Sequence, residues 1–245
     1  MLSLQKGNTE VAEFILNNGA DLTVLTRDGN TPLFLAITKG YSQLAELIIQ
    51  LGGDVNAKTR DGNNPLLEAS GRGYLSVIKK LIERGAKMDA SQKDGRNAAY
   101  EAAQNGHLDV LKLLIQNHSN LINIKGYKGR LPLFPAARKG HIDIVKYFTA
   151  LSNTSVNAQD DDGQTPMIAA AGNGHLETVK YLISLSNKSI YIKDNDGQTP
   201  FIVANRNGHP FVAEYLFSVQ WNITIPKGKY VRINLMTIFH GRNMY

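Results

Sequence analysis

The sequence predicts an all-α solenoid, in which stacked helix-turn-helix units are joined by projecting β-turn loops. A glycine-containing turn motif recurs with steps of 33 and later 34 residues, at Gly29, Gly62, Gly95, Gly129, Gly163 and Gly197. A second glycine, followed by Tyr or His, recurs with the same period, and the apolar residues beyond it have helical spacing. Because no unit of this length could bury its apolar face alone, the repeats must stack.

Each element of a unit follows from its residues, as the first full unit shows. Gly29 supplies a turn, Thr31 is placed to cap a helix, and Pro32 suits the first helical position. A short helix over 33–39 then ends at Gly40. The second helix is predicted from apolar residues on one face, at Leu44, Leu47, Ile48 and Leu51.

The period divides the chain into successive units. The first is incomplete, because the chain begins within a first helix, and we expect the array to be part of a longer one. The last residues contain a degraded turn and helix, which we interpret as a cap over the last repeat. The predicted boundaries are a partial unit 1–27, full units 28–60, 61–93, 94–127, 128–161 and 162–195, a shorter unit 196–221, and a C-terminal capping segment 222–245.

Composition excludes several classes of protein. The 245-residue chain is 42% apolar and 20% charged, which is typical of a folded protein. It contains no Cys, so disulfides, thiolate metal sites and cysteine nucleophiles are excluded. No apolar run approaches a membrane span and no signal-segment pattern is present, so we expect no membrane partner. The expected location is the cytoplasm, with the nucleus as the alternative.

Several stretches of the chain resemble the ankyrin repeat. They are Asn30-Thr31-Pro32-Leu33, Gly106-His107-Leu108-Asp109-Val110 and Gly53-Asp54-Val55-Asn56-Ala57, and the resemblance extends over residues 7–219. It implies paired antiparallel helices with turns projecting at right angles, and protein recognition on the concave face. It also marks Asn56 as a modification site, since ankyrin repeats with this stretch are similar to substrates of an asparaginyl hydroxylase. Asn157 is a poorer match.

Unit 128–161 departs from this pattern. Leu131 stands where Thr normally caps the short helix, and Pro135 is an added proline. Pro135 falls within the first helical turn, where a missing N–H is tolerated.

The residues give no indication of catalysis. His107, His141, His175 and His209 each follow the repeat glycine, so the fold explains their spacing. No phosphate-binding, zinc-protease or nucleophile-elbow motif occurs. An EF-hand reading of the Asp160–Asp162 turn fails, because Ala158 and Ala169 would occupy its first and twelfth positions. We therefore expect no enzyme activity, no metal and no cofactor.

A binding surface remains, formed by turn tips and short helices. Lys128, Arg130, Arg138 and Lys139 are expected to form a basic cluster without a nearby acid, whereas the later turns are acidic. The apolar Tyr100 and Phe134 are either binding aromatics or semi-buried packing, and the charges are either binding groups or a solvated face. The predicted protein-binding residues are Arg60, Arg72, Lys93, Arg96, Tyr100, Glu101, Lys128, Arg130, Phe134, Arg138, Lys139, Asp161 and Asp162.

These observations favour a non-catalytic protein-protein interaction module, a scaffold or adaptor that is monomeric. Its partner would be an acidic and partly hydrophobic protein segment. The alternative is a regulatory or targeting segment of a larger enzyme, channel or microbial effector. Nucleic acid is not expected as a partner, because the turn tips lack interleaved aromatics and the late acidic turns would repel phosphate.

Overall fold

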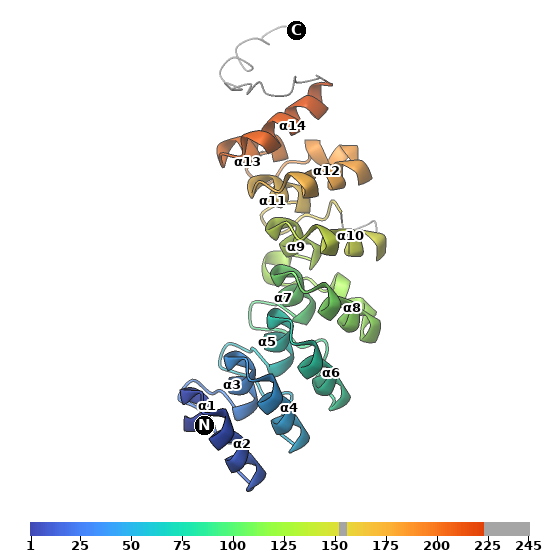
Figure 1. The fold of residues 1–245 in the computed structure, drawn as a ribbon. Coiled ribbons are helices and arrows are strands. Elements are labelled where there is room, and N and C mark those ends of the chain that lie inside the picture. The colour runs from blue at the N-terminus through green and yellow to red at the C-terminus, as the bar shows by residue number, and fades with distance from the viewer. Residues whose placement is uncertain (152–155, 223–245) are drawn as a thin grey trace.

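The computed structural model describes residues 1–151 and 156–222, and these form an elongated stack of helix pairs (Figure 1). The predicted all-α solenoid is confirmed. One series of helices is short: α1 (Leu2–Lys6), α3 (Pro32–Lys39), α5 (Pro65–Arg72), α7 (Ala98–Asn105), α9 (Leu133–Lys139), α11 (Pro166–Gly172) and α13 (Pro200–Arg206). The partner series is α2 (Thr9–Asn17), α4 (Ser42–Gln50), α6 (Leu75–Glu83), α8 (Leu108–Asn117), α10 (Ile142–Leu151), α12 (Leu176–Leu185) and α14 (Pro210–Trp221).

The short helices begin and end where their capping residues predict. The side chains of Thr31, Asn64 and Asn97 each accept a hydrogen bond from the backbone N–H three residues later, which satisfies a free donor of the first turn. Gly40 ends α3 in the left-handed conformation with a φ of 82°. An L-residue with a side chain rarely adopts this conformation, so the repeat requires glycine here.

Stacking produces one continuous hydrophobic core along the array. Leu33, Ile48, Leu81 and Leu111 are buried side chains from three successive units, and they belong to the same core cluster. Short helices pack against short helices, and the partner helices line up beside them (Figure 1). Each unit therefore gains its apolar contacts from its neighbours, as expected for a repeat array.

The repeated histidines tie each unit to the preceding one. The Nε2 of His107 donates to the carbonyl oxygen of Gly71 at 3.1 Å, and the Nε2 of His141 donates to that of Gln104 at 3.1 Å. His175 and His209 make equivalent bonds to earlier units. The structural role predicted for these histidines is confirmed.

The later connections contain short 3₁₀ helices. Residues Ser119–Asn123 form η1 and residues Asn187–Tyr191 form η4. They bury Leu121 and Ile190 against the core. The extra residue of these units is therefore taken up within the connection, and the helix pairs continue to stack.

Unit 128–161 starts its short helix differently from the others. A 3₁₀ turn, η2 (Tyr127–Gly129), precedes α9, and no side chain caps α9. Lys128 has a φ of 56°, which is unusual for a residue with a side chain. Pro135 lies in the first turn of α9, as predicted.

At the far end of the described chain, α14 is the longest helix. Its Phe217 and Trp221 rings pack together with a centroid separation of 4.4 Å, and both contact the ring of the buried Phe201 in α13. The predicted capping segment, 222–245, lies outside the described residues except for Asn222. Within the described chain, no helix is long and apolar enough to cross a membrane.

Candidate protein-binding grooves

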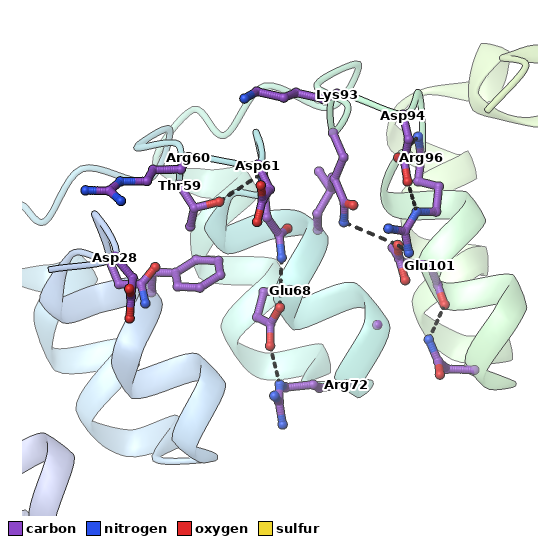
Figure 2. A pocket seen from close by; sticks show the side chains of 17 residues that line it. Asp28, Thr59, Arg60, Asp61, Glu68, Arg72, Lys93, Asp94, Arg96 and Glu101 are labelled. Carbon is purple, nitrogen blue, oxygen red and sulfur yellow. Dashed lines mark hydrogen bonds and ion pairs between the residues drawn. The ribbon is translucent and has the colours of Figure 1, made fainter. Parts of the chain in front are cut away.

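A groove crosses the turns that lead into α3, α5 and α7 and extends down the exposed sides of α5 and α7 (Figure 2). We call it groove A; its volume is about 1060 Å³. Its lining residues come from three successive units and are Asp28, Asn30, Phe34, Thr59, Arg60, Asp61, Asn63, Leu67, Glu68, Gly71, Arg72, Gln92, Lys93, Asp94, Arg96, Glu101 and Asn105. Five predicted binding residues meet here: Arg60, Arg72, Lys93, Arg96 and Glu101.

Glu68 on α5 is held by two donors from its own unit. The Nδ2 of Asn63 donates to its Oε2 at 2.9 Å, and the Nε of Arg72 donates to its Oε1 at 2.6 Å. Both oxygens of this carboxylate therefore have partners.

Glu101 on α7 is more deeply placed, with 8% of its surface exposed. Its Oε1 accepts from the Nη1 of Arg96 at 3.1 Å and from the Nε2 of Gln92 at 3.3 Å. The same Arg96 also binds Asp94 through its Nε at 2.8 Å. Burial raises the pKa of Glu101, and Arg96 partly opposes this shift.

The rim of groove A carries two cations that are not paired. Arg60 and Lys93 are exposed, and neither forms an ion pair with any residue that the structure describes. Figure 2 shows both side chains on the turn side of the groove, with Glu68 and Glu101 on the helix side. The turn side of groove A thus carries these two cations together with the exposed carboxylates of Asp28 and Asp61, and its helix side carries Glu68 and Glu101.

A smaller groove lies further along the array and crosses units 128–161, 162–195 and 196–221. We call it groove B; its volume is about 430 Å³. Arg138 contributes an exposed cation to it. The lining residues are Tyr127, Lys128, Arg130, Arg138, Asp162, Gln164, Ile168, Ala169, Gly172, Asn173, Val203 and Asn207.

The prediction that this basic cluster of unit 128–161 lacks a nearby acid is wrong for Lys128 and Arg130, whereas Arg138 and Lys139 form no ion pair within the described chain. The Nζ of Lys128 lies 2.7 Å from an Oδ2 of Asp162, and the Nε of Arg130 lies 2.8 Å from an Oδ2 of Asp160. The stacking of adjacent turns brings residues about one repeat apart into contact. Asp162 therefore interacts with Lys128 and Arg130 and is not a separate acidic surface.

The predicted binding aromatics are buried, which contradicts their role as exposed anchors. Only 4% of Tyr100 and 3% of Phe134 are exposed. The guanidinium of Arg130 covers the ring of Phe134 at 4.4 Å from its centroid, and the Arg130 side chain is itself 8% exposed. The alternative reading, in which this apolar column is packing, is confirmed.

The remaining predicted residues have other surroundings. Lys139 and Asp161 are exposed and line neither groove. The side-chain amide of Asn56 donates to the carbonyl oxygen of Gly85 at 3.1 Å and accepts from the N–H of Lys87 at 2.8 Å. Asn56 therefore connects two units, and its modification stays a prediction that mass spectrometry after incubation with the hydroxylase would check.

Sequence reasoning did not select Asn63 and Gln92, which donate to the two glutamates, or Asp94, which binds Arg96. Their bonding depends on the folded turn, so no spacing rule indicates it. Gly71 was also missed, although a glycine inside a predicted helix is a signal that could have found it. No group of His, Asp or Glu in the described chain could hold a metal ion.

The stacked helix pairs and the open polar groove define a class: a helical repeat solenoid that presents a long recognition surface. A family model for ankyrin repeats matches the chain in three overlapping stretches, residues 1–92, 66–160 and 133–226. The chain belongs to the ankyrin-repeat family. Proteins of this family are generally protein-protein interaction modules and are typically non-catalytic. A search of curated proteins found no match to the chain.

Proposed function

We propose that this chain is a non-catalytic scaffold or adaptor, which binds a segment of a partner protein in groove A. The observation that carries the proposal is the pair of unpaired, exposed cations, Arg60 and Lys93, on the rim of groove A. The proposed binding site lies in the units over 28–127 and not in unit 128–161, where Lys128 and Arg130 are internally paired.

The exposed cations of the groove support a partner segment with acidic residues. Acidic side chains of the partner would face Arg60 and Lys93, whereas Phe34, which lines the same groove, is itself buried. Exposed rim charges mainly accelerate encounter and make it salt-dependent. We propose a monomeric cytoplasmic protein, and the same groove would serve equally well in a targeting segment of a larger protein.

A random peptide library displayed on phage, selected on the purified chain, provides the probe for a test. Selected peptides are then measured by surface plasmon resonance on the double variant Arg60→Glu/Lys93→Glu. We expect association to slow by about tenfold and to lose most of its salt dependence, because the steering charges are reversed.

The matched control is the double variant Lys79→Glu/Arg84→Glu, which makes the same charge change at exposed positions on and beside α6 that line neither groove. Its association rate should change much less. An equal loss in both double variants, or no loss in the groove variant, would contradict the proposal.

A further inference from the structure

The charged residues around Glu68 and Glu101 in groove A include more carboxylates than cations. Glu101 and Asp94 share the guanidinium of Arg96, whereas Glu68 is bound by Arg72. This group of three acids and two bases is therefore one cation short. Lys93 does not fill the gap, because Figure 2 shows its side chain lying along the rim and pointing away from Glu101.

One oxygen atom of Glu101 is left open by this arrangement. Both donors, Arg96 and Gln92, bind Oε1, and Oε2 accepts no hydrogen bond from any residue that the structure describes. A Cβ atom added to Gly71 would lie 3.6 Å from this Oε2. The open oxygen of a nearly buried carboxylate thus faces the space beside Gly71.

Gly71 places no side chain between the Oε2 of Glu101 and the Nδ2 of Asn105, each 3.6 Å from an added Cβ, and glycine is not required here by the backbone. It lies in the interior of α5 and does not have a positive φ, unlike the glycines that end the helices. Glycine in a helix interior is less stable than alanine. Alanine would fit here with ordinary van der Waals contacts, so neither conformation nor packing explains the glycine.

The two glutamates are also not required for packing. They occupy equivalent positions in α5 and α7, where α3 has Leu35, α11 has Ala169 and α13 has Val203. Burial raises the pKa of Glu101, and the neighbouring charges of Asp94 and Glu68 raise it further. A buried carboxylate that lacks a full complement of cations is unfavourable in the free protein, and a cation supplied by a partner would relieve this.

We propose that groove A takes a lysine or arginine side chain from the bound segment, with its cationic group at the Oε2 of Glu101 beside Gly71. This inference rests on the proposed function. The recognised segment is then of mixed charge: its acidic residues face Arg60 and Lys93, and one basic residue enters between α5 and α7. A uniformly acidic segment would leave the carboxylate of Glu101 without its partner.

The first test uses the same displayed peptide library, selected in parallel on the wild-type chain and on the Glu101→Gln variant. Peptides from the wild-type selection should share one Lys or Arg near their acidic residues. The Glu101→Gln selection should lose that preference, because glutamine keeps the acceptor for Arg96 but removes the charge. A selected peptide should bind Glu101→Gln about tenfold or more weakly.

The second test separates binding from stability. Gly71→Ala fills the space beside Glu101. Because alanine has a higher helix propensity than glycine, the melting temperature of this variant should be unchanged or higher. The selected peptides should nonetheless bind the Gly71→Ala protein about tenfold more weakly than the wild type. Peptides in which norleucine replaces the basic residue should bind the wild type and Gly71→Ala equally. A purely structural role for Gly71 would move stability and binding in the same direction.

Glu83→Gln is the matched control, since Glu83 is an exposed glutamate at the end of α6 that lines neither groove. Peptides that depend on Arg60 and Lys93 but share no basic residue, and that bind Glu101→Gln normally, would overturn the inference and leave the proposed function standing. Selection of no peptides that depend on the groove would contradict both.

Discussion

In units 61–93 and 94–127 the charged residues near the turns line an open groove, whereas in unit 128–161 they hold neighbouring turns together. The turn at Gly62 is closed by a neutral group, since the hydroxyl of Thr59 accepts from the N–H of Asn63. The turn at Gly163 is closed by a carboxylate, since the Oδ1 of Asp160 accepts from the N–H groups of Asp162 and Gln164.

This difference decides which cations are available to a partner. The carboxylate of Asp160 is buried and pairs with Arg130. The Thr59 hydroxyl carries no charge, and Arg60 stays free at the rim. Arg60 is therefore available to a partner, whereas Arg130 is not.

The largest expected effect comes from breaking the buried pair in unit 128–161. Arg130→Ala leaves the carboxylate of Asp160 buried without its cation, and should lower the free energy of unfolding by about 3 kcal/mol. Chemical denaturation measures this, with Arg138→Ala as the control because Arg138 is exposed and forms no ion pair within the described chain. Similar losses in the two variants would refute the distinction between the two regions.

A second substitution sharpens the same comparison. Adding Asp160→Thr to Arg130→Ala replaces the carboxylate with the hydroxyl that closes the turn at Gly62. Because no charge is then buried, most of the lost stability should return. A double variant that is less stable than Arg130→Ala alone would show that the carboxylate itself, not its charge balance, maintains the turn.

An intermediate effect is expected at the cap of α7 in unit 94–127. Asn97 caps this helix with its side-chain oxygen, but its Nδ2 is a buried donor without a hydrogen-bond partner in the described chain. Asn97→Thr keeps the acceptor, as in Thr31, and removes the unsatisfied donor. It should raise the free energy of unfolding by about 1 kcal/mol, whereas Asn97→Ala should lower it by about the same amount. Thermal or urea unfolding of both variants checks the opposite signs.

The smallest effect concerns Glu101, and it has a pH dependence. Burial raises its pKa above the ordinary value of 4.5, so the folded chain binds this proton more readily than the unfolded chain does. The contribution of protonated Glu101 to folding stability is therefore full below pH 4.5, and it is lost as the pH rises through the raised pKa of the folded chain. Glu101→Gln should therefore be slightly more stable than the wild type near neutral pH, and the difference should vanish on acidification. A wild type that is more stable at neutral pH would contradict the view that this acid serves binding.

Sequence reasoning predicted the fold well because the repeat glycines, the caps such as Thr31 and the periodic apolar residues act within one unit or between adjacent units. It placed the site less well. The pairing of Arg130 with Asp160 joins residues in different turns, and no local rule specifies which turns face each other. The sequence did not decide whether Tyr100 is buried, because apolar residues at equivalent positions of successive repeats can face a groove or the next helix.

The aromatic cluster at the end of α14 has a consequence for how this chain can be observed. Trp221 is the only tryptophan in the sequence, and it stacks on Phe217 and against Phe201 in the last described unit. Units of a repeat array interact only with their neighbours, so its two ends can lose structure independently. Intrinsic tryptophan fluorescence therefore reports on the folding of this C-terminal end alone. It does not detect changes in groove A, which is formed by earlier units.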